Sequence, residues 1–544
     1  MRVFVAGRPI LLADDAFVAD GGEARVFAVG DTAYKVFHQP VDPARLSALQ
    51  RLRVPHALLP QQILVDEQGT TVGHSMRYLP SAVPWAKLLS RSYRDRHGVD
   101  DDHALRLVHT LSQRVRAVHR AGAQIVDLHA GNLLLDAGHD HPVLIDTSSW
   151  QLPGFPATAI QDLVRDRHAT TYDEGTDWFA FAVVATQLLL GIHPYRGTHP
   201  SVKGVDARMV ARLSVFRPEV RLPAVCPPRD LVPPRWRSWL QAVLDGDHRG
   251  PPPAEAPDAT SWAPQAVLTT RRLALTELLQ AEGPLAGVVE VGARTLGWTP
   301  LGAPHDGRPP WPVDAVAISV GGSPVGARCQ GGSLVLHDLD RDVDLPLSLR
   351  ARSVQSTNTG FVVLSGPRLI ELTLHDRPGG PLPLPRLLAT VAPEATQLFP
   401  GLFVERLLGR THLGLLGPGR CDRRPFPALD GWSVLHAAHR RSVVALVAER
   451  GGQLDRYVLR VGTCGIEVRH TADVATADLE LVVTPRGLAA LQVDGRLELF
   501  RATPHDDGLR AVEDPALAGG RLVGLGHQLG LVQRDRLYRM SLQG

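Results

Sequence analysis

Three polar side chains stand where short apolar runs end. One run leads directly to Asp127, a glycine-containing turn then leads to Asn132, and a second run ends at Asp146. A carboxylate can orient a hydroxyl group and accept its proton, whereas an amide oxygen and a second carboxylate are the oxygen ligands that Mg²⁺ prefers. The spacing therefore predicts that Asp127 is catalytic and that Asn132 and Asp146 hold a metal ion in a phosphoryl-transfer site.

A cation that could meet phosphates lies further upstream, at Lys35. The chain has 58 basic residues, but only three of them are lysines. Lys35 stands inside an apolar strand pattern, where a compact ammonium group is more useful than a guanidinium fork. The pair Gly21-Gly22 precedes it at a predicted strand turn, and glycines there allow backbone N–H groups to approach phosphates closely. The same pair is also compatible with an ordinary hairpin turn.

The elements that would position these side chains can be read from the pattern. Residues 1–40 read as short strands, and residues 42–53 as a short helix. Apolar positions recur at helical spacing over 102–121, and Gly122 ends this run. A second helix is predicted from Asp177 to Leu190. These helices would support the loop that carries Asp127.

Composition narrows the class of protein. A chain of 544 residues predicts several domains, and 44% hydrophobic with 21% charged residues is typical of globular proteins. The net charge of +2 gives no reason to expect a nucleic-acid partner. The four cysteines are far apart, which fits a reducing compartment, and no apolar run is long enough to cross a membrane. We therefore expect a cytoplasmic protein with no membrane partner.

Several of these motifs together resemble the protein-kinase fold, and most closely a bacterial kinase-like group. The matching segments are Gly21-Gly22-Glu23-Ala24-x-Val26-Phe27 with Lys35, Gly73 to Pro80, Asp127 to Asn132, Asp146-Thr147-Ser148-Ser149-Trp150, and the helix that starts at Asp177. The resemblance implies that ATP is the cofactor, with Gly21, Gly22 and Lys35 at its phosphates and the backbone near Met76 and Tyr78 at adenine. It also implies that His129 assists at the γ-phosphate, and that Asp177 accepts backbone N–H groups of the catalytic loop.

The sequence departs from the kinase pattern at several positions. The helix predicted over 42–53 has no Glu to pair with Lys35. Ile125 and Val126 replace the usual His-Arg pair, and His129 stands where protein kinases usually have a Lys. The run from Asp127 to Asn132 is also similar to that of small-molecule phosphotransferases, whereas the Asp177 helix resembles the protein-kinase form.

The remainder of the chain has a different pattern. Residues 246–285 are predicted to be a proline-rich linker that ends in a short helix over 268–282. From residue 286 onward, short apolar strands recur with a period of about 40 residues. This period predicts a β-propeller of six or seven blades, similar to WD-repeat proteins, that docks a protein substrate or partner.

The predicted fold is thus an α+β bilobal kinase-like domain over 1–245, with lobes of about 1–80 and 81–245, followed by an all-β propeller over 286–544. The leading hypothesis is an ATP- and Mg²⁺-dependent Ser/Thr-type protein kinase. A nucleotide-binding pseudokinase scaffold and a small-molecule phosphotransferase remain as alternatives. The oligomeric state is left open.

Overall fold

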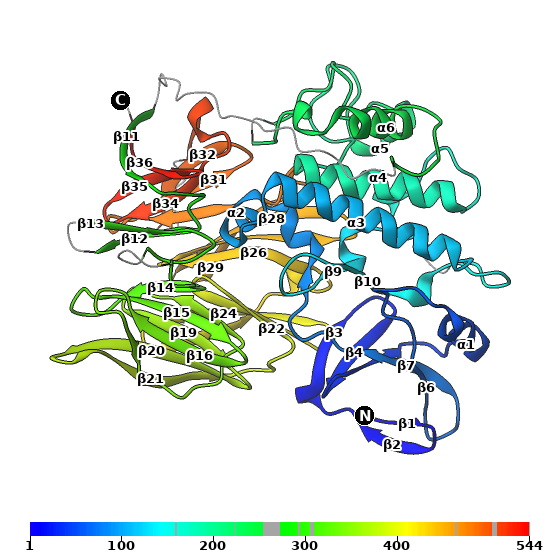
Figure 1. Ribbon diagram of the computed structural model, residues 1–544, viewed down its shortest axis with the longest axis horizontal. Helices are drawn as coiled ribbons and strands as arrows, with labels where there is room; N and C mark the ends of the chain where they lie inside the picture. Colours follow the sequence, from blue (N-terminus) through cyan, green and yellow to red (C-terminus); the bar gives the residue numbers. More distant parts are fainter. Residues whose placement is uncertain are drawn as a thin grey trace.

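The computed structural model describes residues 1–542 except 158–159, 224, 254–272, 292–293, 305–308, 463–464 and 503–508. The chain is mostly β-strand with few helices (Figure 1). We call residues 1–253 the N-terminal region and residues 273–542 the β region. In Figure 1 the N-terminal region lies along the right-hand side and across the top, and the β region lies at the left and in the middle.

The chain begins with a seven-stranded antiparallel sheet in the order β2-β1-β6-β7-β5-β4-β3. Its strands are β1 (Arg2–Val5), β2 (Arg8–Leu11), β3 (Phe17–Asp20), β4 (Ala24–Val29), β5 (Thr32–Phe37), β6 (Gln62–Val65) and β7 (Thr71–Arg77). Successive side chains of a strand point to opposite faces. Tyr34 and Val36 pack into an apolar cluster on one face, so Lys35 points to the other face. There it lies opposite His74 in the register of β5 and β7.

Helices dominate the rest of the N-terminal region. They are α1 (Pro43–Arg51), α2 (Arg91–His97), α3 (Asp101–Arg120), α4 (Glu174–Leu190), α5 (Val205–Ala211) and α6 (Pro234–Leu244), with the small sheet β8 (Val83–Pro84), β9 (Leu133–Leu135) and β10 (Pro142–Leu144). Helix α4 is apolar on all sides and buried almost throughout, because it packs against α3 and α6. The Asp173 side chain and Thr176 form a capping box at its start, and Gly191 (φ 67°) ends it.

Within the described residues, the strands after residue 272 form seven separate antiparallel sheets. Six have four strands and one has two. In chain order the strands are β11 (Leu273–Gln280), β12 (Gly287–Val291), β13 (Arg294–Trp298), β14 (Ala315–Ile318), β15 (Pro324–Gln330), β16 (Ser333–Asp338), β17 (Val343–Leu345), β18 (Ser353–Ser356), β19 (Gly360–Ser365), β20 (Arg368–Arg377), β21 (Gly380–Thr390), β22 (Thr396–Phe399), β23 (Leu402–Leu407), β24 (Arg410–Gly417), β25 (Arg420–Pro425), β26 (Ser433–Arg440), β27 (Val443–Arg450), β28 (Gln453–Gly462), β29 (Gly465–Thr471), β30 (Glu480–Val483), β31 (Leu488–Val493), β32 (Arg496–Arg501), β33 (Leu509–Glu513), β34 (Arg521–Leu525), β35 (Gln528–Gln533) and β36 (Arg536–Leu542).

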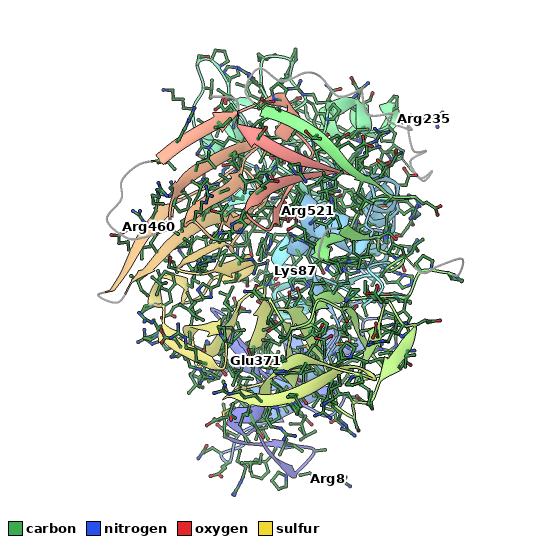
Figure 2. All side chains as sticks on the ribbon, turned by 90° about the vertical axis from the view of Figure 1, so that its left-hand side faces the viewer. Arg8, Lys87, Arg235, Glu371, Arg460 and Arg521 are labelled. Atoms are coloured by element: carbon green, nitrogen blue, oxygen red, sulfur yellow. The ribbon has the colours of Figure 1, made fainter. Side chains whose placement is uncertain are left out.

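Contacts between the first strands of these sheets follow the chain. They join β12 to β14, then β18, β22, β26, β30 and β34 in turn, and β34 also contacts β12. In Figure 2, strands surround the middle of the view, where Lys87 and Arg521 are labelled. The earliest strand, β11, pairs with the last one, β36.

This pairing corrects one expectation. The short helix predicted over 268–282 is wrong in its described part, because residues 273–280 form strand β11. The run LALTELLQ supports either period, and its pairing with the open edge of β36 decides in favour of a strand. Residues 268–272 lie outside the described part of the chain.

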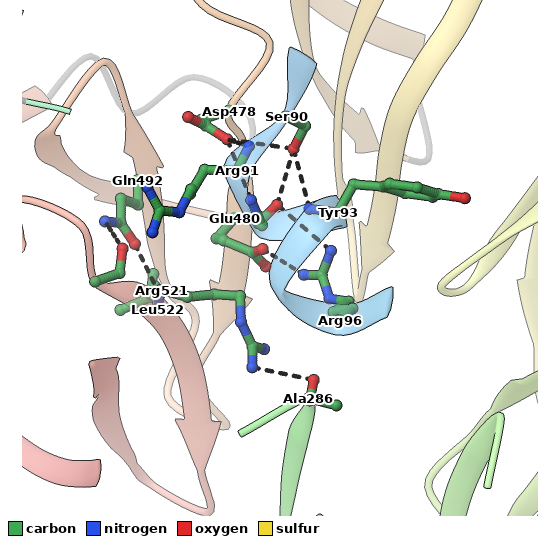
Figure 3. A network of polar contacts seen from close by, with 12 residues as sticks. Ser90, Arg91, Tyr93, Arg96, Ala286, Asp478, Glu480, Gln492, Arg521 and Leu522 are labelled. Atoms are coloured by element: carbon green, nitrogen blue, oxygen red, sulfur yellow. Dashed lines mark hydrogen bonds and ion pairs between the residues drawn. The ribbon is translucent and has the colours of Figure 1, made fainter. Parts of the chain in front are cut away.

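The two regions share one continuous hydrophobic core, which includes residues of α3, α4 and α6 together with residues of β26 to β28 and β30 to β32. Polar contacts join them as well (Figure 3). Arg96 of α2 forms an ion pair with Glu480 of β30, and Asp478 accepts hydrogen bonds from the Arg91 N–H (2.7 Å) and the Ser90 hydroxyl (3.2 Å). Burial raises the pKa of Asp478 to about 6 despite these donors. The β region is therefore packed firmly against the helices.

No helix among the described residues is both long enough and apolar enough to span a membrane.

Candidate active site

Lys35 meets the segment that follows β10. Its Nζ forms an ion pair with Asp146 and donates a hydrogen bond of 2.7 Å to Ser148 Oγ, which in turn lies 3.0 Å from Asp146 Oδ1. Burial alone would raise the pKa of Asp146, but Lys35, the Ser148 hydroxyl and His129 together hold that pKa below its usual value. The site therefore keeps a carboxylate ionised at neutral pH in a largely enclosed position.

The backbone at Asp146 adopts a conformation that is uncommon for residues other than glycine. Asp146 adopts the left-handed conformation (φ 56°), which an aspartate tolerates better than most residues. The chain that follows is fixed by Arg45 of α1, whose guanidinium donates to the carbonyls of Ser148 (2.9 Å), Trp150 (2.7 Å) and Pro156 (2.7 Å). Helix α1 stands where the kinase pattern has a Glu that pairs with Lys35. In this chain the same helix supplies the buried Arg45, which holds the backbone that follows Asp146.

Asp127, His129 and Asn132 lie together on one short loop. Asn132 Nδ2 donates to the Asp127 carbonyl (3.1 Å) and approaches Asp127 Oδ2 (3.4 Å), while His129 Nε2 lies 3.5 Å from Asp127 Oδ2. The His129 ring also accepts the Gly131 N–H through Nδ1 (3.0 Å). The loop is joined to the Lys35 group, because the Ile145 N–H donates to the Asn132 carbonyl (3.0 Å).

The carboxylate of Asp177 holds the backbone at the start of this loop. Its fully buried carboxylate accepts hydrogen bonds from the N–H groups of Ile125 (2.8 Å) and Val126 (2.7 Å), and it lies 2.8 Å from His119 Nε2. Val126 has a φ of 65°, an unfavourable conformation for a β-branched residue. The role predicted for Asp177 is confirmed: it holds the strained backbone that directs Asp127.

The predicted nucleotide-contacting residues lie in three places. Gly21 and Gly22 form the exposed turn between β3 and β4, and nothing lies within 4 Å of the place that a Cβ of Gly22 would take. Met76 is half-buried on the strand next to Lys35, and by the alternation of β7 it shares the face of Lys35. Tyr78 instead contacts the β region: its hydroxyl donates to Glu394, and its backbone N–H donates to the Asp31 carbonyl (2.9 Å).

Four further residues at this site were not anticipated from the sequence. Ser148, Arg45 and Gln161 act through contacts that join segments more than 30 residues apart. The fourth, His74, is buried beside Lys35, and both burial and Lys35 lower its pKa to about 4. The pattern of β7 gave no signal for His74, because Val72 and Met76, which share its face of the strand, are apolar.

The donor set suits Mg²⁺ better than a transition metal. Among the described residues there is no group of three His, Cys, Asp or Glu side chains placed to hold an ion. Asp146 and Asn132 offer a carboxylate and an amide oxygen on neighbouring segments. Mg²⁺ is often held by only one or two such groups, with water and substrate phosphates completing the shell. The residues present therefore fit a phosphate-bound magnesium ion.

Comparison with known proteins does not identify a family for this chain. No known family profile matches the sequence, and no curated protein is similar to it. Among solved structures, the kinase PK-1 of Cydia pomonella granulovirus is similar to 42% of this chain and to 86% of its own, with 14% identity and a TM-score of 0.33.

Proposed function

We propose that the chain is an ATP-dependent phosphotransferase of the protein-kinase type that acts on protein Ser or Thr hydroxyl groups. The observation that carries this proposal is the joining of Lys35, Asp146 and Ser148 beside the loop of Asp127 and Asn132. A cation, two oxygen ligands and a separate carboxylate on a rigid loop are the parts that phosphoryl transfer needs.

Each side chain has a distinct task in this proposal. Asn132 and Asp146 would hold the magnesium ion, which would neutralise the charge of the nucleotide phosphates. Lys35 would turn from Asp146 toward phosphate oxygens, while Ser148 keeps Asp146 in place. Asp127 would orient the acceptor hydroxyl and take its proton. His129, 3.5 Å from Asp127, would donate to the transferred phosphate.

We also infer that the β region is a seven-bladed propeller that docks the protein substrate or partner. The circle of contacts through β12, β14, β18, β22, β26, β30 and β34 supports this inference, as does the pairing of β11 with β36. In a ring of this kind, pairing the first strand with the last one protects the edges that open sheets leave exposed.

A second candidate is a nucleotide-binding pseudokinase scaffold. Two observations favour it: Arg45 replaces the usual partner of Lys35, and Asp127 Oδ1 already accepts a hydrogen bond from the Gln161 N–H (2.7 Å). A small-molecule phosphotransferase is the third possibility. The three candidate functions differ in the phosphate acceptor: a protein for the kinase, none for the scaffold, and a small molecule for the third.

The test compares Asp127→Asn with wild type in radiolabelled ATP transfer to proteins of a cell extract and to small hydroxyl compounds. Asp127→Asn keeps the size of the side chain but removes the proton acceptor, so transfer to proteins should fall by about 100-fold or more. Lys35→Ala should weaken both ATP binding and transfer, and the exposed Asp102→Asn serves as the matched control.

The outcomes separate the candidates. ATP binding without any transfer would favour the scaffold, and transfer to small compounds alone would favour the third candidate. Equal transfer by Asp127→Asn and wild type would refute the role given to Asp127.

A further inference from the structure

The β27–β28 hairpin of the β region reaches the loop that carries Asp127. Strands β27 and β28 are joined by the turn Gly451-Gly452, and this turn lies against residues 160–164 of the N-terminal region. Those residues in turn lie over Asp127. A protein acceptor must approach Asp127 from outside the loop, so this contact bears on access to Asp127.

Residues 160–164 occupy the carboxylate of Asp127. The Gln161 N–H donates to Asp127 Oδ1 (2.7 Å), and the Asp127 side chain is only 10% exposed. The segment is fixed on its far side as well, since His193 Nε2 lies 2.9 Å from the Leu163 carbonyl. The Gln161 N–H takes one acceptor site of Asp127 Oδ1 and its segment covers that oxygen, so an acceptor hydroxyl must reach Asp127 past residues 160–164.

The turn of the β27–β28 hairpin packs closely against residues 160–164. A Cβ on Gly451 would lie 2.3 Å from Gln161 Oε1, and a Cβ on Gly452 would lie 3.2 Å from Leu163 Cδ1. The space between the loop, the segment and the hairpin is a cavity of about 10 Å³, room for one water molecule at most. A side chain at Gly451 would have to displace the end of the Gln161 side chain, one at Gly452 would press on Leu163, and the cavity has no room for an acceptor side chain.

The hairpin also brings a negative charge to the catalytic loop. Glu449 is 5% exposed, and its Oε1 accepts the Gly452 N–H (2.6 Å). Its Oε2 lies 3.7 Å from the place that a Cβ of Gly131 would take, between His129 and Asn132. A buried carboxylate at this position opposes the approach of a phosphate group.

We propose that the β27–β28 hairpin is a built-in closure, which holds residues 160–164 over Asp127 and keeps protein acceptors out until the hairpin is withdrawn. The closure rests on the proposed phosphotransferase function. A protein bound to the β region could withdraw the hairpin and so couple docking to transfer.

The chain supplies a matched control for this proposal. The β15–β16 hairpin has the turn Gly331-Gly332 with φ of 58° and 76°, against 59° and 78° for Gly451-Gly452, and nothing lies within 4 Å of either Cβ position. Asparagine tolerates the left-handed conformation. The double variants Gly451→Asn/Gly452→Asn and Gly331→Asn/Gly332→Asn therefore place the same strain on a turn, but only the first pushes against residues 160–164.

Amide hydrogen exchange of residues 160–164 is the first readout, and phosphate transfer to protein is the second. In Gly451→Asn/Gly452→Asn, exchange should become at least tenfold faster and transfer at least fivefold faster than in wild type. The Gly331→Asn/Gly332→Asn variant should match wild type in both. Leu163→Ala, which removes the contact from the other side, should reproduce both increases even if the 451/452 variant does not fold.

Exchange that stays at the wild-type rate in Leu163→Ala and in a folded 451/452 variant would overturn the closure. Faster exchange with an unchanged transfer rate in an active protein would also overturn it, because the contact would then not limit access. If wild type and all variants transfer nothing while binding ATP, the proposed function itself fails, and the closure as a regulator fails with it.

Discussion

Replacing Asp177 by Asn tests whether one buried carboxylate holds the loop that carries Asp127. The carboxylate accepts two backbone N–H groups at 2.7 and 2.8 Å. Asn can accept only through its carbonyl oxygen, so its amide group would face an N–H donor. The change removes a charge-assisted hydrogen bond, worth about 1.5–3 kcal/mol, and leaves a buried N–H unsatisfied, at a further cost of about 1–3 kcal/mol.

A local loss of about 3 kcal/mol is expected at least, because the strained φ of Val126 also loses its support. A chain of this size does not unfold in one step, so local opening is the right quantity to measure. Each 1.4 kcal/mol is about a factor of ten. Amide exchange of residues 123–128 should therefore become about 100-fold faster in Asp177→Asn.

Asp173→Asn is the control, since it lies on the same helix and Asn caps a helix about as well as Asp. Its exchange rate should stay within about threefold of wild type. A rate in Asp177→Asn that is also within threefold of wild type would refute the reasoning.

Three further changes follow from buried groups. Burial lowers the pKa of His193 to about 3 from 6.5, so the stabilising contribution of this residue is present above pH 6.5 and is lost as the pH falls toward 3. The loss of stability reaches about 2 kcal/mol at pH 5. The Tm should therefore fall less between pH 7 and 5 in His193→Gln than in wild type. Arg45→Met removes three hydrogen bonds to backbone carbonyls, so limited proteolysis should cut within residues 148–156 at least tenfold faster, and equal rates would contradict the holding role. Glu480→Gln leaves Arg96 without its ionised partner and should lower Tm by several degrees, whereas an unchanged Tm would show that this ion pair contributes little.

Local patterns predicted much of the candidate site. The apolar runs before Asp127 and Asp146 correspond to buried backbone, and the apolar helix predicted from Asp177 onward is α4. Lys35 lies on a strand and is buried, as its apolar neighbours indicated. These features follow from residues close together in the chain, which is why the sequence alone reveals them.

Contacts between distant segments were not predictable in this way. Nothing near Arg45 in the sequence distinguishes it from the other arginines, yet it is 7% exposed and bonds to carbonyls more than 100 residues away. The hydrogen bond from the Tyr78 hydroxyl to Glu394 of the β region had no local signal either, while the adenine contact of the backbone near Tyr78 stays a prediction. The run that forms strand β11 supports either period, and its pairing with the edge of β36 determines its form. In each case the structure of the segment depends on the distant residues that it contacts and not on its own sequence.

We propose that Lys35, Asn132 and Asp146 form a magnesium-dependent nucleotide site. The most direct measurement is calorimetric titration of ATP into the full chain with Mg²⁺ and with a chelator, in wild type, Asp146→Ala and the control Asp102→Asn. We expect wild type and the control to bind ATP only with Mg²⁺, and Asp146→Ala to bind at least tenfold more weakly. No binding by wild type, or equally tight binding by Asp146→Ala, would contradict it.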